Sequence, residues 1–142
     1  MKPKIFLDTN IILDLLGKRE PFFEDIAKIA TLAERGELTL VISALSYSTV
    51  NYILEKYEKH NVVISKLQKF KMISTISALD ESVIDSALNS NFEDFEDALQ
   101  YYSALRSNCD VILTRNCKDF RVSSLPIMTA DDFLNQFYNF EG

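Results

Sequence analysis

The chain has 142 residues, of which 47% are hydrophobic and 25% are charged, with a net charge of −6 at pH 7. This length fits one domain, expected over residues 1–142, and the apolar content suffices for a core without a disulfide or metal staple. No run approaches the roughly 18 apolar residues of a membrane span, and no signal-peptide pattern opens the chain. We therefore expect a cytoplasmic protein that does not associate with membranes.

Strand and helix signals alternate along the chain. Residues 4–7 form a short apolar run, typical of a buried strand, that ends at Asp8. Thr9 or Asn10 can cap the helix that follows, and Pro21 fits the first turn of a second helix. The predicted elements that follow are a strand over 38–42, helices from Ser43 and over 62–70, and a strand over 72–76. The last ones are a helix that Asp80 or Ser82 opens and that extends to Asn89, a helix over 94–107, strands over 111–113 and 126–128, and a helix over 130–137 that Thr129 caps.

This alternating order predicts an α/β fold with a mostly parallel sheet of four to five strands and helices on both of its faces. In open sheets of this kind, ligands bind beyond the carboxyl ends of the strands. The residues that follow each predicted strand are therefore the first candidates for a functional site.

Carboxylates gather at these strand ends. Asp8 ends the first strand, Asp119 follows the fourth, and Asp94 and Asp97 stand three residues apart at the start of a helix. Crowded carboxylates repel one another and lose hydration, so they require protonation or a cation. A divalent metal removes that cost and can activate a water for attack on a phosphodiester.

Simpler roles exist for each acid taken alone. Asp8 could be only a helix cap, Asp94 could favour a helix N-terminus while Asp97 is merely solvated, and Asp119 could sit in an ordinary turn. Asp14, within the first helix, is expected at the surface or behind the metal ligands.

Other metal chemistry is poorly supported by the composition. Cys109 and Cys117 do not form a zinc motif, and His60 is the single histidine. A metal would therefore be held by oxygen ligands, which suits Mg²⁺ or Mn²⁺.

Three segments together resemble the signatures of the PIN domain family. They are the strand and helix around Asp8-Thr9-Asn10, the helix start Asp94-Phe95-Glu96-Asp97-Ala98, and Thr114-Arg115-Asn116-Cys117-Lys118-Asp119-Phe120, in the family's order and spacing over residues 3–135. The resemblance implies a three-layer α/β/α sandwich and RNA cleavage that depends on Mg²⁺ or Mn²⁺. For many bacterial members of this size it also implies a VapC-like toxin, a small antitoxin partner and a homodimer.

The resemblance assigns roles to individual positions. Asp8 and Asp97 would be metal ligands, Asp119 would complete the cluster directly or through water, and Asp94 would add an extra acid. Thr114 and Asn116 would orient the metal ligands or a phosphate, and Asn10 would brace the loop after the first strand. Separately, we expect Arg115 to contact RNA. The chain departs from the family at Thr49, where many members carry a glutamate.

A basic segment stands apart from the acidic residues. Residues 55–71 carry five lysines and two glutamates, whereas residues 80–97 carry seven acids and no lysine or arginine. We expect Lys66, Lys69 and Lys71 to contact RNA phosphates, although a solvated helix face explains the same pattern.

Two other classes of protein place an aspartate after the first strand. Haloacid-dehalogenase-like phosphatases need a second aspartate two residues later, where this chain has Asn10, and the acidic pair and lysine of response-regulator receivers are missing. The stronger alternative is a PIN-fold protein with a degraded site, acting as an RNA- or protein-binding module, which Thr49 and the acidic net charge favour.

Overall fold

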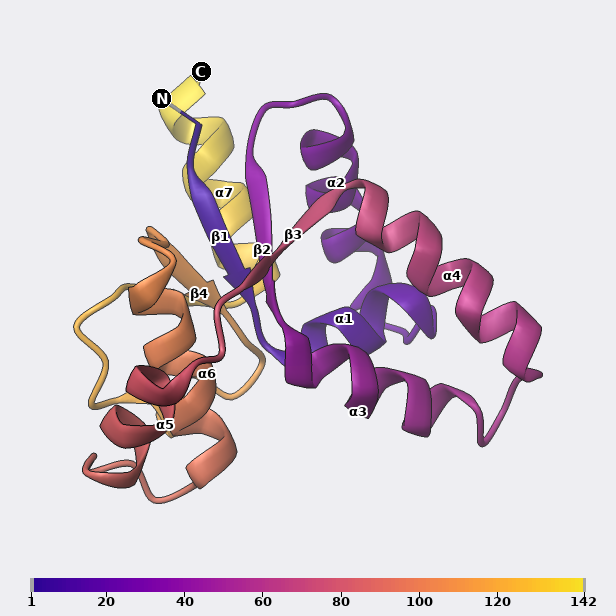
Figure 1. Ribbon diagram of the computed structural model, residues 1–142. Helices are drawn as coiled ribbons and strands as arrows, with labels where there is room; N and C mark the ends of the chain where they lie inside the picture. The colour runs from indigo at the N-terminus through magenta and orange to yellow at the C-terminus, as the bar shows by residue number, and fades with distance from the viewer. Residues whose placement is uncertain (1, 142) are drawn as a thin grey trace.

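A central parallel sheet organises the molecule, as the computed structural model of residues 2–141 shows (Figure 1). Its strands lie in the order β3-β2-β1-β4-β5, and every neighbouring pair is parallel. The prediction of four to five mostly parallel strands is therefore confirmed. The strands are β1 (Lys4–Leu7), β2 (Thr39–Ser43), β3 (Ser74–Ser77), β4 (Val111–Leu113) and β5 (Ile127–Met128).

Helices cover both faces of this sheet and make the three layers that the resemblance implied. In Figure 1, α5 and α6 lie on one side of the strands, whereas α1, α2 and α4 lie on the other. The helices are α1 (Thr9–Leu16), α2 (Phe23–Glu34), α3 (Ala44–Leu54), α4 (His60–Met72), α5 (Glu81–Leu88), α6 (Phe95–Arg106) and α7 (Ala130–Glu141), with a 3₁₀ turn, η1, at Cys117–Phe120.

The alternation of side chains along β1 divides the core into two parts. Ile5 and Leu7 point into a large cluster that includes residues of α1, α2, α3, α4 and α7. Phe6 points to the opposite face, where it packs with Tyr101 of α6 and Phe120 of η1. Because successive strand residues face opposite sides, one short apolar run supports both layers of helices.

Several predicted boundaries differ from the observed ones. Asp8 is the N-cap of α1, because its side chain accepts a hydrogen bond from Thr9 N, so the cap is neither Thr9 nor Asn10. Pro21 precedes α2 instead of lying in its first turn, since the helix begins at Phe23. The cap at Thr129 is confirmed, because its Oγ1 accepts a hydrogen bond from Asp132 N at 3.1 Å. None of the helices within residues 2–141 has the length and apolar character needed to cross a bilayer.

The centre of the sheet brings two sequence-distant segments together. β1 pairs with β4 in a register that sets Leu7 beside Leu113, the last residue of each strand. Asp8 N continues the ladder by donating to Leu113 O at 2.9 Å. The residues that follow the two strands, Asp8 and Thr114, therefore meet at the carboxyl edge of the sheet.

Candidate active site

Asp8 and Thr114 form the buried centre of the site. Asp8 is only 6% exposed, and its Oδ2 accepts a 2.7 Å hydrogen bond from Thr114 Oγ1 while its Oδ1 accepts one from Thr9 N at 2.8 Å. Burial raises the pKa of Asp8, and the charge of Asp119 adds to this effect, whereas hydrogen bonds from Thr114, Thr9 and Gln100 oppose it. The carboxylate is thus held in one orientation inside a poorly hydrated environment.

The start of α6 supplies the second part of the site. Asp94 is the N-cap, and its Oδ1 accepts a hydrogen bond from Asp97 N at 2.9 Å. This cap fixes the first turn of α6, so that Asp97 and the buried Gln100 lie one turn apart on the side that faces Asp8.

Asp97 shows how strongly the site concentrates negative charge. Burial, followed by the charges of neighbouring acids, raises its pKa to about 7; these acids are Asp94, Asp8, Asp119 and Glu96. Partial burial and the charges of Asp94 and Asp8 also raise the pKa of Glu96. No Lys, Arg or His within residues 2–141 makes an ion pair with Asp8, Asp94, Asp97 or Asp119. The four predicted aspartates therefore share one electrostatic environment, and none of them is ion-paired within the described residues.

The donor set fits a hard cation in chemistry and in charge. Carboxylate oxygens are the ligands that Mg²⁺ and Mn²⁺ prefer, and a cation would relieve the repulsion that raises the pKa of Asp97. In the part of the chain that the structure describes, however, no three His, Cys, Asp or Glu side chains are grouped closely enough to hold a metal ion together. Binding would require the carboxylates to move inward or waters to complete the coordination shell.

A cleft leads from solvent to these acids. It has a volume of about 700 Å³ and is lined by Asp94, Asp97 and Asp119 together with Phe92, Lys118 and Arg121. Asp8 does not line this cleft and lies deeper in the protein.

The predicted supporting residues occupy different positions around the centre. Asn116 is exposed, and its backbone N–H donates to Thr114 Oγ1 at 3.1 Å, which orients the hydroxyl toward Asp8. Asn10 has a buried Oδ1 without a hydrogen-bond partner in the described residues, so its side chain makes no bracing contact through this atom. Thr49 lies half-buried in α3, one turn after Ser46, whose hydroxyl is 2.8 Å from Thr9 Oγ1. This part of α3 therefore faces the beginning of α1.

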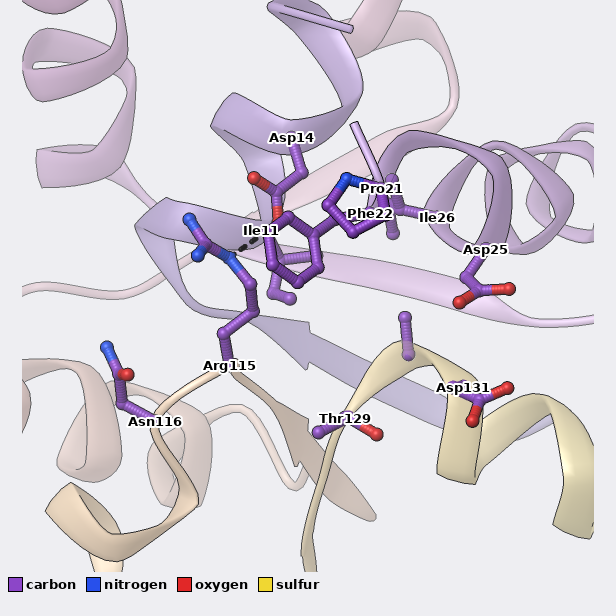
Figure 2. Close-up of a pocket in the computed structure, with 11 residues that line it drawn as sticks. Ile11, Asp14, Pro21, Phe22, Asp25, Ile26, Arg115, Asn116, Thr129 and Asp131 are labelled. Atoms are coloured by element: carbon purple, nitrogen blue, oxygen red, sulfur yellow. Dashed lines mark ion pairs between the residues drawn. The ribbon is translucent and has the colours of Figure 1, made fainter. Parts of the chain in front are cut away.

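Arg115 lies beside the site in a pocket of its own (Figure 2). Its Nε is 2.9 Å from Asp14 Oδ2, and its Cζ lies 4.2 Å from the centre of the Phe22 ring. Asp14 is 1% exposed, so of the two places expected for it, the one at the surface is wrong. Burial raises the pKa of Asp14, whereas the charges of Arg115 and Arg19 oppose this shift.

The three predicted RNA-binding lysines lie away from the acids. Lys66 Nζ is 2.7 Å from Glu58 Oε1 and donates to Leu16 O at 2.8 Å, so its charge is already paired. Lys69 and Lys71 are exposed in the last turn of α4, which leads into the beginning of β3 (Figure 1). Since all strands are parallel, β3 begins at the sheet edge opposite to Asp8 and Thr114.

Sequence reasoning missed Gln100, Glu96 and the Asp14–Arg115 pair. Gln100 could have been found from its position three residues after Asp97, which places both side chains on one helix face. The Asp14–Arg115 pair joins residues that are remote in the chain, and neither neighbourhood signals it.

Comparisons with known proteins agree with this architecture. The PIN domain family model matches residues 4–118. "Ribonuclease VapC1" of Aquifex aeolicus (strain VF5) is 26% identical over 139 residues, which cover 94% of this chain and 95% of that protein.

Two solved structures share the fold. VapBC2 from Rickettsia felis, bound to a DNA fragment from its promoter, superposes with a TM-score of 0.68 at 21% identity, covering 87% of this chain and 96% of the other. A toxin–antitoxin complex from Klebsiella pneumoniae superposes with a TM-score of 0.66 at 20% identity, covering 89% of this chain and 97% of the other. The match of the family model to most of the chain, supported by the five-stranded parallel sheet, shows that the chain belongs to the PIN domain family.

Proposed function

We propose that the protein is an endoribonuclease that depends on Mg²⁺ or Mn²⁺ and hydrolyses RNA phosphodiesters. One observation carries this proposal: Asp8, Asp94, Asp97 and Asp119 share an electrostatic environment at the carboxyl edge of the sheet, with no ion-pair partner in residues 2–141. The ribonuclease relative, which matches this chain over nearly its whole length, supports RNA as the substrate.

Each aspartate takes a role that follows from its environment. Asp8 and Asp97 would hold the metal, Asp119 would add a ligand directly or through water, and Asp94 would contribute charge while it caps α6. A bound Mg²⁺ or Mn²⁺ would lower the pKa of a coordinated water and offset charge on the phosphodiester.

The neighbouring side chains orient the acids and the substrate. Thr114 fixes the Asp8 carboxylate through its 2.7 Å hydrogen bond, and Asn116 in turn fixes the Thr114 hydroxyl. Arg115, which directly follows Thr114, would hold a phosphate of the RNA strand. Because the Asp8 carboxylate already accepts two hydrogen bonds, its orientation is set before a ligand enters.

Metal titration combined with an RNA cleavage assay tests the proposal. Wild type should cut single-stranded RNA only with Mg²⁺ or Mn²⁺, and Asp97→Asn should lower the rate by at least about a hundredfold because it removes a ligand charge. Asp85→Asn is the matched control, since Asp85 is an exposed acid on α5 away from the cleft, and it should keep the wild-type rate. Metal-independent cleavage, or equal rates for wild type and Asp97→Asn, would refute the assignment.

A binding module without catalysis is the second candidate. Thr49 stands where many family members carry a glutamate, and no three acids within residues 2–141 are grouped closely enough to hold a metal. RNA binding that persists with no cleavage at any tested concentration of Mg²⁺ or Mn²⁺ would favour this candidate.

We also propose a small antitoxin partner and a homodimer, in the cytoplasm. The support for the antitoxin partner is the similarity in fold to structures described as VapBC2 and as a toxin–antitoxin complex. The homodimer rests on the resemblance to VapC-like toxins, and the location rests on the sequence alone. Expression of this chain should slow bacterial growth, and co-expression of a neighbouring small gene should restore growth and yield a co-purifying complex. Normal growth together with active RNA cleavage in vitro would separate the enzyme from the toxin role.

A further inference from the structure

A second pocket lies next to the residues that follow β4 and is separate from the acidic cleft. It has a volume of about 550 Å³ and is lined by residues of α1, the start of α2, the segment after β4 and the start of α7. The acidic cleft is lined instead by residues around the start of α6 and by η1. The two cavities thus flank the residues that follow β4, and the volume of the second one is typical of small-ligand sites.

Arg115 forms one wall of this pocket and contacts two side chains there. The Asp14 carboxylate engages its Nε, and the Phe22 ring covers one face of the guanidinium. Figure 2 shows the two terminal nitrogens at the free end of the side chain, beyond the ion pair, and the Arg115 side chain is 31% exposed. A guanidinium fixed in this way is suited to a phosphate, because little side-chain entropy remains to be lost.

The opposite wall of the pocket carries carboxylates. Asp25 is half-buried and Asp131 is exposed, and both lie across the pocket from Arg115 (Figure 2). The apolar side chains of Ile11 and Ile26 also line the pocket. Two carboxylates exclude a second phosphate from this side, and they accept hydrogen bonds from N–H groups.

Asp14 provides an independent indication of a missing donor. It lines the pocket and is 1% exposed, and neither its Oδ1 nor its Oδ2 makes a hydrogen bond within residues 2–141, since the 2.9 Å contact between Oδ2 and Arg115 Nε is an ion pair without hydrogen-bond geometry. A buried oxygen of this kind is costly unless a ligand or a water donates to it. The ligand therefore has one anionic end for Arg115 and a flat, partly apolar body that carries N–H donors.

We propose that this pocket binds one nucleotide of single-stranded RNA next to the scissile phosphate, with its phosphate on Arg115 and its base between Phe22 and the carboxylates. The assignment rests on the proposed ribonuclease function. Phe22 is 39% exposed although it contacts Arg115, so part of its ring remains available for stacking. Guanine fits best, because its Watson–Crick edge offers adjacent N1–H and amino donors to a carboxylate, whereas uracil offers one donor and two carbonyls.

Consecutive acids on α7 allow a matched test. Asp131 lines the pocket, whereas Asp132 is exposed and does not, so Asp131→Asn and Asp132→Asn change the net charge equally. Wild type, both variants and Phe22→Leu would cut a pool of single-stranded RNAs randomised around the cut site, and the products would be sequenced. Circular dichroism would confirm that each variant is folded.

The expected result is a preference for guanine over uracil of about tenfold at one position beside the cut in wild type and Asp132→Asn. In Asp131→Asn and Phe22→Leu this preference should fall to about threefold or less, while cleavage of the remaining sequences continues. Cleavage without a base preference, or with one that Asp131→Asn leaves unchanged, overturns the pocket assignment but leaves the proposed function intact.

Binding measurements separate a failure of the pocket from a failure of the enzyme. Fluorescence anisotropy with guanine-rich and uracil-rich oligonucleotides would be repeated in an Asp97→Asn background, which should bind RNA without cutting it. If wild type cuts nothing but an Asp131-dependent guanine preference persists in binding, the pocket stands and the catalytic proposal fails. If Asp131→Asn weakens binding of an arginine-rich peptide and leaves RNA binding unchanged, the pocket serves a protein cation and the nucleotide assignment is wrong.

Discussion

Asp8 and Asp14 are two buried carboxylates of the same helix, α1: Asp8 is its N-cap and Asp14 lies within it. Their electrostatic surroundings are nevertheless opposite. Asp14 has a cation within the fold, because Arg115 Nε lies 2.9 Å away. Asp8 has none in the described residues, and the charge of Asp119 adds to its burial in raising its pKa. The fold therefore places a cation beside one acid and none beside the other.

This contrast separates a structural ion pair from a functional cluster. Removing either member of an internally paired group leaves the other uncompensated, so stability falls. Removing an acid from a cluster of like charges relieves repulsion, so stability is maintained or rises while function is lost. The same type of substitution should therefore have opposite effects on the free energy of unfolding at the two places.

The largest effect on stability is expected from Arg115→Met. It leaves the buried Asp14 carboxylate without its cation and should lower the free energy of unfolding by about 3 kcal/mol, at the lower end of the range for buried pairs because Arg115 remains 31% exposed. The double variant Asp14→Leu with Arg115→Met should recover most of the loss. Urea denaturation measures both; a double variant no more stable than Arg115→Met would show that the pair is not the cause.

The second expectation is that the free energy of unfolding depends on pH because of Asp97 in the cluster of four aspartates. The folded-state pKa of Asp97 is raised to about 7 from an ordinary value of 3.8, so the folded state binds the proton more tightly than the unfolded state. The metal-free protein should therefore be most stable below about pH 4 with respect to this group, and should lose that stability as the pH rises to about 7. Thermal melts in EDTA across this range measure the trend, and Asp97→Asn should flatten it.

Manganese should reverse this trend, because it binds the ionised carboxylates of the folded state. The rise in melting temperature on adding Mn²⁺ should be larger at pH 8 than at pH 5. An equal rise at both pH values, or none, would mean that the cluster does not bind the metal.

Thr49→Glu adds an acid near the start of α1 and tests whether position 49 belongs to the metal site. The new carboxylate increases the ligand charge, and we expect manganese to bind on the order of tenfold more tightly. Thr49→Gln, similar in size but neutral, is the matched control. Isothermal titration calorimetry measures both, and equal affinities for the two variants would place position 49 outside the metal site.

The smallest effect is expected from the lysines of α4. If Lys69 and Lys71 contact phosphates, replacing both by glutamine should lower the salt dependence of RNA binding by about 0.7 per contact. Their position at the opposite edge of the sheet leads us to expect a smaller change than for Arg115→Gln. If the salt dependence of RNA binding instead falls by about 0.7 for each lysine, the prediction from the sequence that Lys69 and Lys71 bind RNA is supported.

The sequence predicted those parts of the fold and the site that depend on local signals. The apolar run before Asp8 and the caps at Asp94 and Thr129 are local, and the parallel pairing of the strands follows from general rules for alternating strands and helices. Contacts between distant segments were not predictable in this way. The charge count of residues 55–71 suggested a free basic patch, but Lys66 turns back to Glu58 and to the end of α1.

The hydrogen bonds that continue the central ladder past β1 and β4 also determine which half of the site is dynamic. Asp8 N–H donates to Leu113 O and Thr114 N–H donates to Met128 O, both at 2.9 Å, so the amides of the two central site residues belong to the sheet. Asp97 N–H is instead bonded to the exposed side chain of Asp94 at the end of a helix. Native-state hydrogen exchange should therefore be slow at Asp8 and Thr114, through openings close to global unfolding, and fast at Asp97 through local fraying. The half of the site that contains Asp8 and Thr114 would persist as long as the fold does, while the half that contains Asp97 opens and closes many times within that period.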